Sequence, residues 1–76
     1  MRFWITYQDD SREPFETYSP DVLVIKIMQL LMLAGCDVQT QWRQSASIVA
    51  CLLFEGKSQY PHGDSDPYFV IVDEKP

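Results

Sequence analysis

Residue types that carry catalysis or bind metals are scarce in this chain. Its 76 residues include one histidine, two cysteines and three glycines that stand singly. A lone histidine leaves little from which to build a metal site or an activated nucleophile. Isolated glycines exclude a glycine-rich phosphate loop, which needs several glycines close together. We therefore expect a protein that is not an enzyme and uses no cofactor.

Positive charge is scarce as well. Six Lys and Arg residues stand against eleven Asp and Glu residues, and the formal net charge is −5 at pH 7. This balance disfavours direct binding to nucleic acid or to an anionic membrane. It favours a protein partner with a basic surface, and such partners are often proteins that themselves handle nucleic acid.

The chain also lacks segments that would direct it to or through a membrane. Residues 1–5 have neither the long apolar run nor the small-residue cleavage site of a signal peptide. The most apolar stretch is interrupted by Lys26 and Gln29, and it is shorter than the roughly 20 residues that a membrane span needs. The expectation is a cytoplasmic protein.

Length and cysteine content limit the architecture. A chain of 76 residues forms one domain, residues 1–76, and buries only about 60% of the surface that its unfolded form exposes. Cys36 and Cys51 are too few for a disulfide scaffold. Their apolar neighbours predict buried free thiols, and the sequence leaves open whether either is reactive.

One helix is predicted over residues 20–34. Ser19 is a good N-cap, and Pro20 suits the first helical position because its missing N–H would have no partner there. Asp21 places negative charge at the positive end of the helix dipole. Gly35 supplies the left-handed residue that commonly ends a helix.

This helix carries apolar residues on more than one face. A broad face is suited to packing on a sheet, whereas further apolar residues lie on or beside the opposite, polar stripe. That second set comprises Val22, Ile25, Met32 and Leu33. Two alternatives remain open: loops of the same chain cover these residues, or a second copy does, in a homodimer.

Four strands are predicted from alternation or from continuous apolar runs, at residues 2–8, 37–44, 47–55 and 68–73. The first strand places Trp4 on the face opposite Phe3 and Ile5. Residues 9–18 and 56–67 read as loops, punctuated by proline and glycine. The fold class is therefore α+β: two layers, one helix packed on a four-stranded, mainly antiparallel sheet, in the order β-α-β-β-β.

One cluster could hold a metal ion. His62, Asp64 and Asp66 stand at alternate positions in the second loop and could meet an ion from one side. No further ligand has a spacing that completes the site, so solvated carboxylates are the preferred interpretation and no metal is expected.

The acidic residues of the two loops form a candidate partner-binding surface. Carboxylates on a rigid sheet can occupy an arginine- and lysine-lined groove in place of phosphates, and nearby tyrosines can supply apolar anchors. The plainer alternative is an ordinary solvated surface. The candidate residues are Asp9, Asp10, Glu13, Glu16, Tyr18, Tyr60, Asp64 and Asp66.

In size, acidity and economy, the chain is similar to small phage-encoded inhibitors, such as anti-CRISPR proteins and protein mimics of DNA. The resemblance is one of composition and implies no individual site residue. Together with the absence of a catalytic set, it leads to the hypothesis of an inhibitor or adaptor that binds a basic protein surface. The alternative is a homo-oligomeric structural or small-ligand-binding α+β domain.

Overall fold

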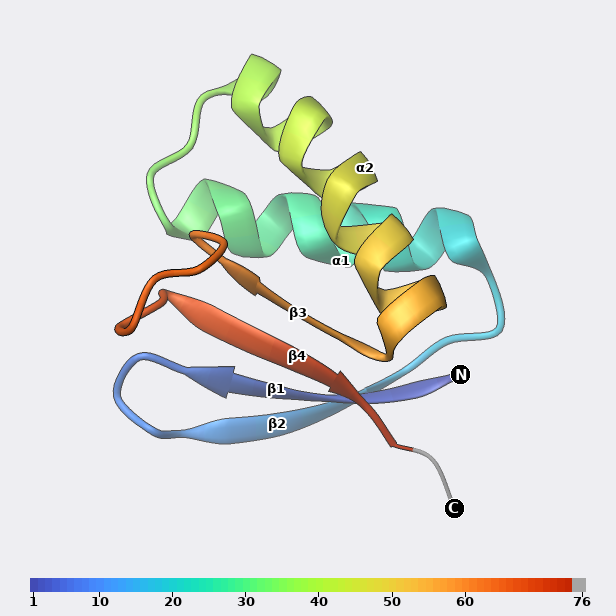
Figure 1. The fold of residues 1–76 in the computed structure, drawn as a ribbon. Coiled ribbons are helices and arrows are strands. Elements are labelled where there is room, and N and C mark those ends of the chain that lie inside the picture. Colours follow the sequence, from blue (N-terminus) through green and yellow to red (C-terminus); the bar gives the residue numbers. More distant parts are fainter. Residues whose placement is uncertain (75–76) are drawn as a thin grey trace.

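The computed structural model describes residues 1–74 and contains two helices and four strands, in the order β-β-α-α-β-β. The helices lie together over one face of the sheet (Figure 1). The prediction of an α+β fold with a four-stranded antiparallel sheet is confirmed. The predictions of a single helix and of the order β-α-β-β-β are wrong. The elements are β1 (Arg2–Tyr7), β2 (Arg12–Glu16), α1 (Pro20–Leu33), α2 (Val38–Glu55), β3 (Lys57–Tyr60) and β4 (Phe69–Asp73).

The sheet has the order β2-β1-β4-β3, and every neighbouring pair is antiparallel. Two hairpins, β1–β2 and β3–β4, therefore bracket the helices in the sequence and join through β1 and β4 in space. Tyr7 pairs with Phe69, which in turn pairs with Tyr60. The turns of both hairpins consequently leave the sheet at the same end (Figure 1).

Two predicted loops contain strands. β2 lies within residues 9–18 and pairs with β1, with Pro14 opposite Trp4. Proline is tolerated there because β2 is an edge strand and has a side that needs no N–H for the ladder. β3 occupies the first part of residues 56–67 and forms the other edge.

α1 forms close to its predicted bounds. Pro20 occupies the first turn with Asp21, and Gly35 follows the helix at a φ of +90°. The predicted cap is wrong, because the Ser19 side chain makes no capping hydrogen bond. The Thr17 hydroxyl instead accepts from the Ser19 N–H at 3.1 Å and orders the entry to the helix.

α2 replaces two predicted strands. Asp37 caps it by accepting a hydrogen bond from the Thr40 N–H at 2.8 Å, and Gly56 ends it in the left-handed conformation. Between the two predicted strands, residues 37–44 and 47–55, the Ser45 hydroxyl donates to the Trp42 carbonyl oxygen within the helix. Val38 and Trp42, four residues apart, share a face in a strand and also in a helix, so their spacing does not separate the two.

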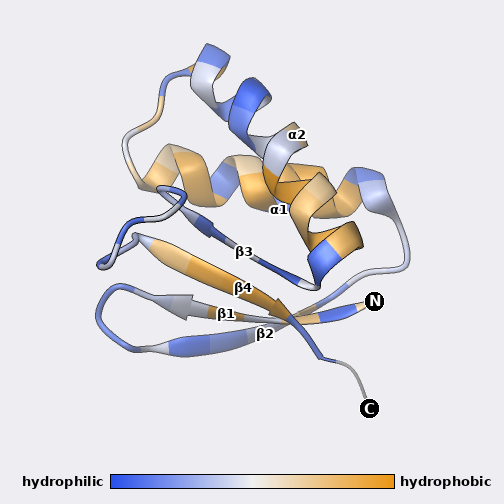
Figure 2. Cartoon of the chain, in the orientation of Figure 1, coloured by the Kyte–Doolittle hydropathy of each residue, from blue (hydrophilic) through white to orange (hydrophobic). Residues whose placement is uncertain are grey.

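The core lies between the helices and the sheet. Figure 2 shows hydrophobic residues along α1, β4 and the C-terminal half of α2. The ten buried hydrophobic residues come from β1, both helices and β4; they are Phe3, Ile5, Leu23, Ile27, Leu30, Leu31, Ile48, Leu52, Phe69 and Ile71. Cys36 and Cys51 are free, but both are only half-buried, so the prediction of buried thiols is wrong in degree.

The other face of the sheet has no second layer from residues 1–74. Trp4 lies there, opposite Phe3 and Ile5 as predicted, and is half-buried. The guanidinium groups of Arg2 and Arg12 lie 5.8 and 4.7 Å from its ring centroid. Trp4 is thus shielded by two cations rather than by another element.

Candidate protein-binding surface

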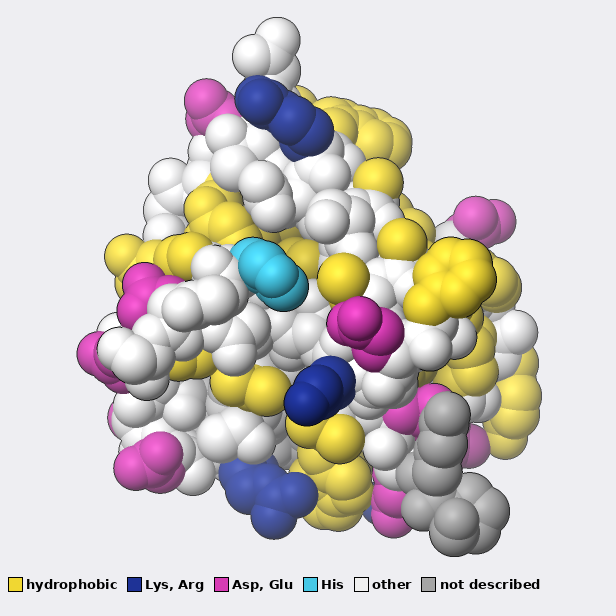
Figure 3. All heavy atoms as spheres, in the orientation of Figure 1, with side chains coloured by type: hydrophobic (Ala, Val, Ile, Leu, Met, Phe, Trp, Pro, Cys, Tyr) yellow, Lys and Arg dark blue, Asp and Glu magenta, His cyan; other side chains and the backbone are white. Residues whose placement is uncertain are grey.

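The two hairpin turns bring four aspartates to one end of the molecule. Gln8 Nε2 donates to Asp66 Oδ2 at 3.3 Å, which joins the β1–β2 turn to the β3–β4 loop across 58 positions of sequence. Figure 3 shows acidic side chains along the side on which these loops lie in Figure 1. We call this surface the hairpin end; it comprises Gln8, Asp9, Asp10, Asp64, Asp66 and Tyr68, all exposed.

Local hydrogen bonds order both turns of the hairpin end. Asp9 Oδ1 accepts from the Ser11 hydroxyl at 2.6 Å and from the Ser11 N–H at 3.0 Å. These bonds lower the pKa of Asp9. Asp64 Oδ1 accepts from the Asp66 N–H at 3.0 Å, and Gln59 Nε2 donates to the Asp64 carbonyl oxygen at 2.7 Å. The carboxylates are therefore presented on structured turns, which reduces the entropy lost on binding.

Tyrosines border the acidic residues. Tyr60 stacks with Tyr68, with ring centroids 6.3 Å apart, and Tyr68 is 46% exposed. Tyr60 is half-buried, and the Cys36 thiol donates to its hydroxyl at 3.2 Å. This bond, together with burial, raises the pKa of Tyr60. Tyr60 thus supports Tyr68 rather than presenting a free surface of its own.

A small hollow opens beside Tyr68, where the end of α1 meets the sheet. It has a volume of about 140 Å³, and its lining is mainly apolar: Tyr7, Leu30, Leu33, Ala34, Tyr68 and Phe69. Such a hollow next to fixed carboxylates could receive one apolar side chain of a partner.

Glu13 does not belong to the hairpin end. It accepts a hydrogen bond from the Tyr7 hydroxyl and lies 3.3 Å from Lys26 Nζ on α1. The bond from Tyr7 is the main cause that lowers the pKa of Glu13. Burial and the Glu13 carboxylate raise the pKa of Tyr7 to about 12. Glu13 therefore connects the β1–β2 hairpin to α1.

Glu16 and Tyr18 lie at the opposite end of β2. The Tyr18 hydroxyl donates to Glu16 Oε1 at 2.8 Å, and Tyr18 is 88% exposed. Tyr18 therefore does not pack onto α1. Phe15 instead packs against the core and pins this segment. Of the eight residues predicted to bind a partner, the structure brings Asp9, Asp10, Asp64 and Asp66 to one end of the sheet, and Tyr60 stacks on Tyr68 beside them.

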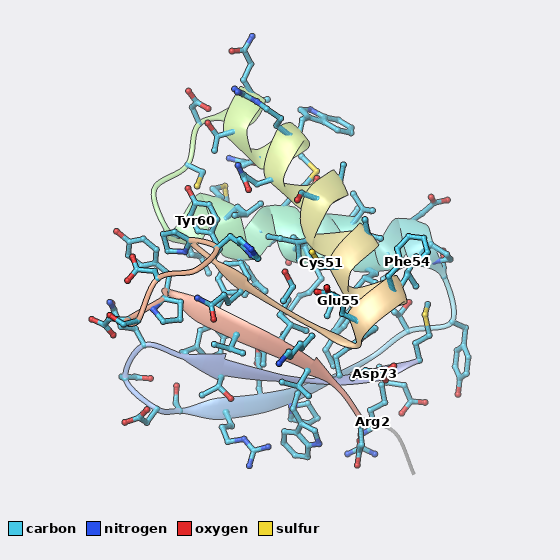
Figure 4. The ribbon with its side chains drawn as sticks, in the orientation of Figure 1. Arg2, Cys51, Phe54, Glu55, Tyr60 and Asp73 are labelled. Atoms are coloured by element: carbon cyan, nitrogen blue, oxygen red, sulfur yellow. The ribbon has the colours of Figure 1, made fainter. Side chains whose placement is uncertain are left out.

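A second hollow lies between the end of α2 and β3. It has a volume of about 240 Å³, and Figure 4 shows Cys51 and Glu55 on the side of α2 that faces β3. Within residues 1–74, no three His, Cys, Asp or Glu residues are grouped closely enough to hold a metal ion. His62, Asp64 and Asp66 thus do not converge. The lining residues are Cys51, Glu55, Lys57, Ser58, Gln59, His62, Gly63 and Val70.

One member of the hairpin end, Gln8, is missing from the predicted binding residues, because the sequence places it only as the last position of the first strand. No local signal identifies Gln8, because its importance comes from a contact with Asp66 that only the pairing of β1 with β4 creates.

Comparisons with protein-family models, curated proteins and solved structures found no significant match. The described residues contain no helix with the length and apolar character required to cross a membrane.

Proposed function

We propose that this protein is a non-enzymatic inhibitor or adaptor that binds a basic surface of another protein through its hairpin end. The observation that carries the proposal is the contact between Gln8 and Asp66, which unites two acidic turns into one surface. The favoured partner is a nucleic-acid-handling protein, in which the four aspartates would occupy a phosphate-binding groove as a mimic of DNA.

Charge distribution supports this function. The hairpin end contains four carboxylates and no basic side chain. The nearest base in sequence, Arg12, lies with its guanidinium 4.7 Å from the Trp4 ring centroid, on the open face of the sheet. Exposed charges act over a Debye length of about 8–10 Å at ordinary ionic strength, so a basic groove would be attracted before contact.

The apolar residues beside the aspartates also support a role in protein binding. Tyr68 is partly exposed and is backed by Tyr60, and the hollow beside it is lined by α1 and β4. Interfaces gain most of their affinity from a few aromatic or apolar anchors that fill pockets, with charges setting orientation and rate.

The test is affinity capture from a cell lysate followed by mass spectrometry, with three forms of the tagged protein. One variant changes Asp9, Asp10, Asp64 and Asp66 to Asn. This change removes the four charges but keeps a side-chain oxygen that can accept the hydrogen bonds within each turn. The matched control removes four charges elsewhere: Glu16→Gln, Asp21→Asn, Glu55→Gln and Glu74→Gln. Both variants have the same net charge.

We expect the wild type and the control to capture the same basic protein, and added salt or duplex DNA to release it. The four-Asn variant should lose that protein. Capture of the same protein by the four-Asn variant, or capture unaffected by salt and DNA, would contradict the proposal.

The alternative expected from the sequence, a homo-oligomeric domain, is supported by a separate surface on the helices.

A further inference from the structure

The helices expose many large apolar side chains. Twelve such side chains are exposed within residues 1–74, and eight of them belong to α1 or α2. The four α1 residues predicted to lie on or beside the polar stripe are among them, with exposed fractions of 45% to 79%. The alternative in which loops cover these residues is therefore wrong. The eight are Val22, Ile25, Met32, Leu33, Val38, Trp42, Leu53 and Phe54.

α2 carries an exposed row at every fourth position: Trp42, Ala46, Ala50 and Phe54. Trp42 is 62% exposed and Phe54 is 89% exposed. Figure 4 shows Phe54 projecting to one side of α2, whereas Cys51 and Glu55 lie toward β3. Val38, four residues before Trp42, continues the row at the start of the helix. From Trp42 to Phe54, the row has an aromatic residue at each end and two small residues between them. It forms one of the i±4n ridges through which helices pack.

This row is complementary to itself when reversed. A two-fold axis that crosses the row midway between Ala46 and Ala50 places Trp42 opposite the partner's Phe54, and Ala46 opposite the partner's Ala50. Ridges of this kind interdigitate at a crossing angle of about −50°, and alanines at the crossing allow the helix axes to approach to about 8 Å. The same surface then serves both copies, as a closed two-fold dimer requires.

The charge distribution permits this pairing. Arg43 is the only charged residue between Val38 and Phe54 on α2. The aspartates of the hairpin end belong to the turns of the sheet, so two copies, each with a net charge of −5, can meet without acidic rows facing each other.

The exposed area is also sufficient. A standard interface buries about 800 Å² per partner, and about 65% of a homodimer interface is apolar, which amounts to roughly 500 Å². Trp42 and Phe54 together expose roughly 230–380 Å², given exposed fractions of 62% and 89% and about 150–250 Å² for a whole aromatic side chain. Leu53, three positions after Ala50 and 57% exposed, and Val38, four positions before Trp42 and 64% exposed, supply much of the remainder.

We infer that the outward side of α2, along Trp42, Ala46, Ala50 and Phe54, is the interface of a two-fold homodimer. The occupant is a second copy of this chain. The inference is independent of the proposed function, because the hairpin end takes no part in the contact.

The experiment measures mass by light scattering from low micromolar to millimolar concentration. The wild type should approach twice its chain mass of 8.8 kDa. Ala46→Glu and Ala50→Glu should each raise the dimer dissociation constant at least about a hundredfold, since each buries unpaired carboxylates at the crossing. Ser65→Glu, which adds the same charge in an exposed loop, should leave the dimer unchanged. Circular dichroism confirms that each variant is folded.

A second measurement needs no change in α2. In a Trp4→Phe background, Trp42 is the only tryptophan, and its emission should shift to the blue and resist acrylamide quenching as the dimer forms. A wild type that stays monomeric throughout would overturn the inference. So would a dimer in which Trp42 remains freely quenched, or one that survives both glutamate substitutions in folded protein.

Discussion

Replacing Tyr7 with Phe removes one hydroxyl and tests how the β1–β2 hairpin is held to α1. That hydroxyl donates to Glu13, which also contacts Lys26. A hydrogen bond to a charged group contributes about 1.5–3 kcal/mol where solvent is excluded. The Glu13 side chain is 42% exposed, so solvent screening reduces the expected loss to about 1 kcal/mol. In a domain of this size, that loss lowers the unfolding midpoint by about 4–8 °C.

The effect should depend on pH in a defined direction. The pKa of Glu13 is lowered from 4.5 in the folded state, so its contribution is present above pH 4.5 and is lost as the pH falls through the lowered value. The pKa of Tyr7 is raised from 10.0 to about 12, so its contribution is present below pH 10.0 and is lost as the pH rises toward 12. The difference between wild type and Tyr7→Phe is therefore largest between these limits.

Thermal unfolding followed by circular dichroism across this pH range measures the difference. Tyr18→Phe is the matched control, because the Tyr18 hydroxyl donates to Glu16 in the same way but from an 88% exposed side chain. We expect no measurable change for Tyr18→Phe. Equal midpoints for wild type and Tyr7→Phe at neutral pH, or a difference that persists undiminished in acid, would refute the reasoning.

Substitutions at three further positions test the helices by thermal or chemical unfolding. Gly35→Ala should cost about 1–2 kcal/mol by backbone strain alone, since φ is +90° and an added Cβ meets no atom within 4 Å; no loss would contradict this. Asp37→Ala should lower both the unfolding midpoint and the helical signal of α2, whereas Asp37→Asn should not, because Asn can still accept from Thr40. Ile27→Ala should cost about 2–5 kcal/mol, since Ile27 is 0% exposed; a smaller cost would imply looser packing.

Residues within a short stretch of sequence were sufficient to predict α1 and β1. Pro20 and Gly35 mark the limits of α1, and the alternation around Phe3 and Ile5 identifies β1 and its buried face. Both are set by contacts within a few residues, so a short stretch of sequence contains the information that determines them.

Local signals failed where a pattern of apolar residues fits a helix and a strand equally well, or where a strand is defined by pairing with a distant part of the sequence. Ile48 and Leu52 are buried, yet Leu53 and Phe54 beside them are exposed, and together they make a continuous apolar run that resembles a central strand. Pro14 indicated a loop, but proline is compatible with β2 because β2 is an edge strand.

The candidate site followed the same rule. The acidity of both loops was evident from composition, whereas their union at one end required the pairing of β1 with β4. Glu13 was predicted to bind a partner protein because it is acidic. Its charge is instead paired with Lys26, which lies in a distant part of the chain.

The most direct test of the proposed binding surface is an amide-resolved NMR titration of the isotope-labelled protein with an arginine-rich peptide. The account predicts that chemical-shift changes concentrate at residues 8–11 and 61–68 and disappear in the four-Asn variant. Changes that concentrate on α2 or on the open face of the sheet, or that persist in that variant, would contradict it.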